Sequence, residues 1–136
     1  MVQRPHLIAV VDDEECVRAA LARMLRASSF EVSIYASGQE FLDSLARERP
    51  DCVVMDFHMP GLSGWDVQRE LVRSRQFIPL IIVTAHDHPA LRENALGDGA
   101  AGYLTKPLRG ETLVGAIAQA IRSHTAAHPP AAGRGL

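Results

Sequence analysis

Several kinds of residue are scarce in this sequence, and each shortage excludes a class of protein. Only 5% of the 136 residues are aromatic and only two are cysteine, so a disulfide-rich secreted scaffold is not indicated. No apolar run approaches the roughly 20 residues of a membrane span, and the N-terminus lacks the charged-then-apolar pattern of a secretory signal. We therefore expect one cytoplasmic globular domain without a membrane span, in which Cys16 and Cys52 are free, buried thiols.

A large excess of positive charge is also missing. The formal net charge is −2 at pH 7 and the arginines are scattered, which argues against direct binding of nucleic acid by this chain. Lysine is almost absent, because 13 of the 14 basic residues are arginine and Lys106 is the single lysine. A general bias toward arginine explains the excess. Against that bias, the lone lysine indicates a position that needs a compact ammonium group.

Short apolar segments alternate with segments of helical period along most of the chain. The strands are predicted at 6–11, 30–35, 51–55, 80–84 and 102–104. The helices are predicted to follow the acidic cluster at 12–15, to begin near residue 37, to run over 64–73, to begin near residue 89 and to run over 110–122. This alternation predicts an α/β fold with a doubly wound, five-stranded parallel sheet and helices on both faces.

The last 14 residues have a different composition. Residues 123–136 are rich in Ala, Pro and Gly and show no apolar period. We expect residues 1–122 to form the domain and residues 123–136 to be a disordered tail or a truncated linker.

The predicted strand ends bring acidic residues together. Asp12 and Asp13 follow the first strand, Asp56 follows the third, Thr84 ends the fourth, and Lys106 comes soon after the fifth. In a doubly wound sheet these carboxyl ends are where ligands bind. Three carboxylates at one place repel each other unless a cation neutralises them. Oxygen ligands alone favour a hard divalent ion, with Mg2+ as the first choice and Mn2+ as the second.

Such a site suits phosphoryl transfer. A carboxylate beside a divalent cation can attack phosphorus, because charge neutralisation and positioning supply most of the catalysis. Asp56 is the predicted nucleophile, and the Thr84 hydroxyl and the Lys106 ammonium would donate to the phosphoryl oxygens. The product is an acyl phosphate that adds negative charge to the site.

Four segments, in this order, resemble the motifs of one family, the receiver domains of two-component response regulators. They are VVDDEE at 10–15, VMDFHMPGLSG at 54–64, IVTA at 82–85 and GYLTKP at 102–107. The overall run is most similar to the receivers of nitrogen-fixation-type transcriptional regulators. The resemblance implies a flavodoxin-like fold with strand order 2-1-3-4-5.

The resemblance also implies a role for each matched residue. Asp56 would accept the phosphoryl group from a sensor histidine kinase or a phosphotransfer protein. Asp12 and Asp13 would hold the metal together with Asp56 and the backbone carbonyl of His58. The chain would be a switch and not an enzyme, apart from its own phosphotransfer and dephosphorylation.

The switch itself would use the later motifs. Thr84 would be the switch hydroxyl, and Tyr103 would be the aromatic that moves inward with it. Lys106 would pair with Asp56 or its phosphate, and the Lys106–Pro107 bond would be cis. The surface of the fourth helix, fifth strand and fifth helix would change and be recognised by a downstream effector, the chain's own missing output domain, or a second copy in a homodimer.

Other functions on the same residues fit less well. A phosphatase with an aspartyl nucleophile needs a second acid two residues later, where this chain has His58. A flavin or nucleotide module would place phosphate beside Asp12 and Asp13, which repel it. A zinc site is disfavoured because His58, His86 and His88 lack zinc-type spacing and have no cysteine beside them.

Overall fold

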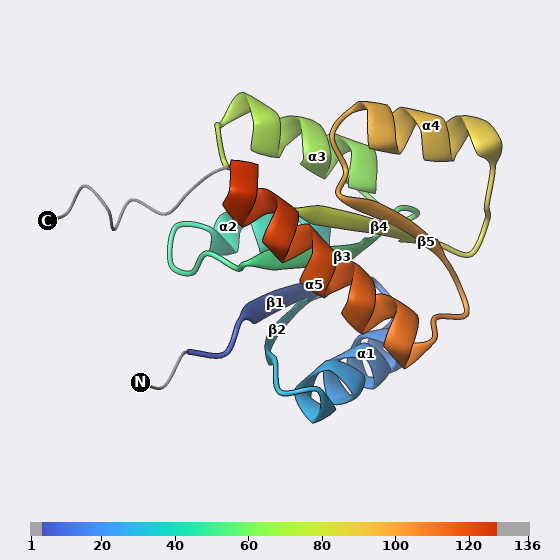
Figure 1. The fold of residues 1–136 in the computed structure, drawn as a ribbon. Coiled ribbons are helices and arrows are strands. Elements are labelled where there is room, and N and C mark those ends of the chain that lie inside the picture. Colours follow the sequence, from blue (N-terminus) through green and yellow to red (C-terminus); the bar gives the residue numbers. More distant parts are fainter. Residues whose placement is uncertain (1–3, 128–136) are drawn as a thin grey trace, which may run out of the picture.

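A single parallel sheet forms the centre of the molecule. The computed structural model describes residues 4–127 (Figure 1). Its strands are β1 (Leu7–Val11), β2 (Glu31–Tyr35), β3 (Cys52–Asp56), β4 (Leu80–Thr84) and β5 (Gly102–Thr105). All neighbouring strands are parallel, and their order is β2-β1-β3-β4-β5. The predicted doubly wound, flavodoxin-like order is therefore confirmed.

Five helices cover the two faces of this sheet. They are α1 (Glu15–Ala27), α2 (Gly38–Ser44), α3 (Gly64–Arg73), α4 (Pro89–Gly97) and α5 (Gly110–Ala127). Helices α1 and α5 pack on one face, and α2, α3 and α4 pack on the other (Figure 1). Alternate strand residues point to opposite faces. Ile8 and Val10 therefore pack against α1 and α5, and Ala9 and Val11 lie on the face covered by α2, α3 and α4. Every residue of β3 and β4 is buried, as expected of strands covered on both sides.

Local signals fix where the helices begin. Ser63 caps α3 by accepting a hydrogen bond from the Asp66 amide, and the Asp66 carboxylate accepts one from the Ser63 amide in return. Ser37 caps α2 in the same way, since its hydroxyl accepts from the Glu40 amide. Helix α4 is weakly anchored by comparison, because Ala95 is its only fully buried residue.

The last helix is longer than the sequence predicted. Helix α5 continues to Ala127, so the expected end at residue 122 is wrong, and so is the expectation of disorder over 123–127. This stretch contains no Gly or Pro to stop the helix, and Gln119 Nε2 donates to Ser123 Oγ one turn later at 3.1 Å. The rest of the predicted tail, residues 128–136, lies outside the described residues, and the linker assignment stays a prediction.

The two cysteines differ in exposure. Both are free. Cys52 is buried in β3, where burial raises the pKa of its thiol to about 12. Cys16 is exposed, which makes the prediction that both thiols are buried wrong. It lies five residues before the buried Leu21, and five residues of helix carry its side chain to the opposite side of α1. No helix within residues 4–127 is long and apolar enough to cross a membrane.

Candidate functional site

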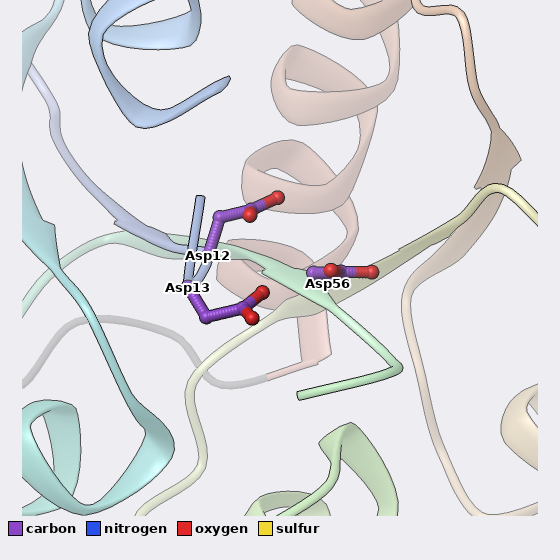
Figure 2. A group of neighbouring side chains, drawn as sticks. All are labelled: Asp12, Asp13 and Asp56. Carbon is purple, nitrogen blue, oxygen red and sulfur yellow. The ribbon is translucent and has the colours of Figure 1, made fainter. Parts of the chain in front are cut away.

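Three carboxylates meet beyond the carboxyl ends of β1 and β3. Asp12 and Asp13 follow β1 directly, and Asp56 is the last residue of β3 (Figure 2). One oxygen of each carboxylate lies within 4.8 Å of the others. Asp12 and Asp56 are 1% and 7% exposed, whereas Asp13 is exposed. The parallel register causes this meeting, because Val11 pairs with Met55 and the residue after each is an aspartate.

Asp12 is fixed by its own loop. Its Oδ1 accepts a hydrogen bond from the Glu14 amide at 2.9 Å, and its carbonyl accepts one from Arg18 Nη1 at 2.8 Å. Its amide donates to the Tyr35 carbonyl at 3.2 Å, which ties the loop to the end of β2. These contacts orient the carboxylate toward the site, and Arg18 is a contributor that no sequence pattern indicated.

Lys106 brings the positive charge. Its Nζ lies 3.0 Å from Asp12 Oδ2 and 3.6 Å from Asp56 Oδ2. The Lys106 amide donates to the Thr84 carbonyl at 2.8 Å, which holds the lysine at the end of β4. The Lys106–Pro107 bond is cis, as the resemblance implied. The hydrogen bond of the ammonium therefore goes to Asp12, and Asp56 is its longer-range partner.

The charges in this site are unbalanced, because one ammonium faces three carboxylates. Burial raises the pKa of Asp56; the ammonium of Lys106 opposes this rise and the charge of Asp12 adds to it. Burial alone would lower the pKa of Lys106, but the hydrogen bond to Asp12 and the charge of Asp56 outweigh it and raise the pKa. The site thus favours a state in which further positive charge is bound.

A divalent cation fits this arrangement. Asp12, Asp13 and Asp56 form the only group of three acidic, histidine or cysteine side chains in residues 4–127 with ligand atoms close enough to share an ion. All three offer oxygen, which suits a hard cation. His58 follows Asp56 by two residues and its side chain is exposed. That its carbonyl is a further ligand stays a prediction.

The two predicted switch residues lie on neighbouring strands. Thr84 is completely buried, and its Oγ1 accepts a hydrogen bond from the His86 amide at 3.0 Å. Tyr103 is 4% exposed and pairs with Ile82, two residues before Thr84. Residues two apart in a strand point to the same face, so the Tyr103 ring and the Thr84 side chain share the face covered by α2, α3 and α4. Their switch roles stay predictions.

Two ring contacts near the site were not predicted. The His58 and His86 rings meet edge to face, with centroids 5.5 Å apart. The Arg92 guanidinium carbon lies 5.2 Å from the centroid of the Tyr103 ring. Each contact depends on how two different elements or loops pack together, so no spacing in the sequence could have revealed it. Neither histidine belongs to the carboxylate cluster of Asp12, Asp13 and Asp56.

The combination of fold and acidic site matches known proteins. Residues 8–118 match the sequence profile of the response regulator receiver domain family. The chain belongs to this family. Response regulator protein TodT of Pseudomonas putida is 34% identical over 122 residues, which cover 90% of this chain and 54% of that protein. Response regulator MprA of Mycolicibacterium vanbaalenii is 38% identical over 121 residues, which cover 89% of this chain and 52% of that protein.

Solved receiver structures agree over almost their whole length. A receiver domain protein from Clostridium thermocellum is 32% identical with a TM-score of 0.81, over 87% of this chain and 95% of that one. FixJ-N is also 32% identical with a TM-score of 0.81, over 88% of this chain and 96% of that one. This receiver domain spans about half the length of the curated response regulators that it matches.

Proposed function

We propose that this receiver domain is a phosphorylation-dependent switch whose phosphoacceptor is Asp56. One observation carries the proposal. The carboxylate oxygens of Asp12, Asp13 and Asp56 lie close enough to share one ion, and the Lys106 ammonium lies beside Asp12 and Asp56. A buried carboxylate that faces other carboxylates destabilises the fold unless its charge is neutralised. It becomes useful where a cation and a phosphoryl group arrive together.

The metal is proposed to be Mg2+, with Mn2+ as an alternative. Asp12, Asp13, Asp56 and the His58 carbonyl would hold it, and when bound it supplies positive charge that neutralises the incoming phosphoryl oxygens. The Asp56 carboxylate attacks phosphorus, and the bond to the donor's leaving group breaks as the acyl phosphate forms. Lys106 then donates to an oxygen of the new phosphate.

The signal is proposed to leave the site through Thr84. Its oxygen accepts a hydrogen bond from the His86 amide, its O–H would donate to a phosphoryl oxygen, and Tyr103 on the same face of the sheet follows the change. The surface of α4, β5 and α5 would then differ between the two states. A downstream effector, an output domain of the same protein or a second copy of the chain would recognise that surface.

The donor is proposed to be a sensor histidine kinase or a phosphotransfer protein, with both partners in the cytoplasm. The family supports this, because its curated members are response regulators. We propose a switch and not a turnover enzyme. A phosphatase would need an acid two residues after Asp56, and His58 occupies that position with its side chain exposed.

Acetyl phosphate with Mg2+ tests the proposal. The wild-type chain should shift on a phosphate-affinity gel, and Asp56→Asn should abolish the shift. Asp43→Asn, an exposed acid on α2, is the matched control and should shift like the wild type. A shift that persists in Asp56→Asn, or an unshifted wild type, would contradict the assignment.

A further inference from the structure

Tyr103 is buried at a cost. Its ring packs in the core beneath α4, but its buried hydroxyl lies near the Asp87 carboxylate and the His88 backbone without a well-formed hydrogen bond to either. A buried hydroxyl that has lost water and gained only poorly aligned partners destabilises the buried position. In an outward position the hydroxyl would regain water, and the ring would lose its packing. The two positions of this ring are thus closer in free energy than is usual for a core aromatic.

Helix α4 has few other attachments to the rest of the molecule. Only Ala95 is fully buried, and one side-chain hydrogen bond crosses from α3, in which Gln68 Nε2 donates to the Ala95 carbonyl at 3.2 Å. Arg92, one turn before Ala95, places its guanidinium over the Tyr103 ring at 5.2 Å. A cation over an aromatic face is attracted by the ring's quadrupole. Arg92 therefore stabilises the buried ring and joins α4 to β5.

We propose that Arg92 is a positioning residue that holds the Tyr103 ring beneath α4 and thereby sets the fraction of molecules with the ring buried. No other charged side chain in residues 4–127 has its cation over this ring. The link to signalling rests on the proposed function, in which Thr84 and Tyr103 respond together. If phosphorylation favours one ring position, a variant that changes the ring equilibrium also changes the phosphorylation equilibrium, by at most the same factor.

The ring position can be measured without any phosphate, by the rate at which tetranitromethane nitrates Tyr103. Nitration requires access to the ring, so its rate follows the exposed fraction even when that fraction is small. The chain contains only two tyrosines, and Tyr35, packed edge to face on Phe41, is the internal reference. The full chain should carry Cys16→Ser, because the exposed thiol would consume the reagent. Peptide mass spectrometry then gives the rate at each tyrosine.

Arg92→Gln should raise the nitration rate of Tyr103 about two- to fivefold, which corresponds to the loss of one exposed cation–π contact. Arg92→Lys keeps a cation and should raise it less. The matched control is Arg69→Gln, because Arg69 lies over the Trp65 ring at 5.7 Å on α3 and should leave Tyr103 unchanged. Tyr35 should react at the wild-type rate in all three variants.

Three results would overturn the proposal: an unchanged Tyr103 rate in Arg92→Gln, an equal rise in Arg69→Gln, or a parallel rise at Tyr35 that reports general loosening. The same measurement in an Asp56→Asn background separates this proposal from the proposed function. Arg92→Gln should act there equally, since the ring contact needs no phosphoacceptor. A chain that fails the phosphorylation test can therefore still pass this one.

Discussion

The Lys106 ammonium lies closer to Asp12 than to the proposed phosphoacceptor, at 3.0 Å from Asp12 Oδ2 against 3.6 Å from Asp56 Oδ2. Asp12 is almost fully buried and is held by its own loop, so it anchors the ammonium beside Asp56. From there a small movement of the flexible lysine stem brings it within hydrogen-bond distance of an oxygen attached to Asp56. A point charge on a flexible stem suits this task, whereas a planar guanidinium is larger and rigid.

Replacement of this lysine by arginine should therefore impair phosphorylation even though the charge is kept. We expect Lys106→Arg to slow the acetyl-phosphate reaction by about tenfold, which corresponds to the loss of one charge-assisted hydrogen bond. The rate is measured from the shifted fraction on a phosphate-affinity gel over time. Arg73→Lys, on the exposed surface of α3, is the reverse exchange and should change nothing. Equal rates in Lys106→Arg and the wild type would remove the argument from the lone lysine.

The second prediction concerns the cost of burying the ionised Asp56 carboxylate. Because the pKa of Asp56 is raised in the folded chain, the folded chain binds that proton more tightly than the unfolded chain does. Ionised Asp56 therefore lowers stability above its folded pKa, and this cost disappears as the pH falls toward the ordinary carboxyl value of about 4. In a buffer with a metal chelator, Asp56→Asn should raise the free energy of unfolding by about 1 kcal/mol near neutral pH.

Urea denaturation at several pH values measures this effect. The difference between Asp56→Asn and the wild type should shrink steadily as the buffer becomes more acidic. The Asp43→Asn control should show no such gain. If Asp56→Asn were less stable than the wild type at neutral pH, the fold would stabilise the ionised Asp56 carboxylate. That result would contradict the raised pKa of Asp56.

The third prediction concerns the loop after Asp56. Gly61 has φ of +80°, a left-handed conformation that a side chain disfavours, although nothing lies within 4 Å of an added Cβ. We expect Gly61→Ala to lower the free energy of unfolding by about 1–2 kcal/mol through backbone strain alone. Gly97→Ala, at the end of α4 with equally open space and no left-handed φ, should be neutral or slightly stabilising. The denaturant midpoints of the two variants measure this difference in stability. Equal midpoints would contradict the prediction that the left-handed φ of Gly61 disfavours a side chain.

Thiol chemistry should separate the two cysteines. Cys16 is exposed and should react with a disulfide reagent within seconds to minutes at mildly alkaline pH. Cys52 should not react in the folded chain, because burial both blocks access and raises the pKa of its thiol to about 12, which keeps it protonated. Counting the released chromophore before and after denaturation should give one thiol and then two. Two fast thiols in the native chain would show that β3 is open to solvent.

Much of the fold followed from local patterns. The first four residues of β3 and of β4 are all apolar, and these runs indicate strands that are covered on both faces. The meeting of Asp12, Asp13 and Asp56 followed from strand order, because parallel strands end at one edge. The end of α5 was missed, because the loss of the apolar period after Arg122 does not end the helix where residues 123–127 contain no Gly or Pro.

Other features depend on contacts between distant segments. The exposure of Cys16 depends on which face of α1 packs against the sheet, and that packing is a contact between segments that the sequence around Cys16 does not define. The Arg92 contact with Tyr103 depends on how α4 lies over β5, a relation with no fixed spacing in the sequence. The preference of Lys106 for Asp12 over Asp56 likewise depends on distances that only the folded chain defines.

The central claim is that Asp56 itself carries the phosphoryl group, and chemical trapping tests it most directly. After reaction with acetyl phosphate and Mg2+, borohydride reduces an acyl phosphate to the alcohol, so the modified aspartate becomes homoserine. Peptide mass spectrometry should find homoserine at position 56 only, and only when both acetyl phosphate and Mg2+ were present. Homoserine at Asp12 or Asp13 in place of Asp56, or none at all, would contradict the account.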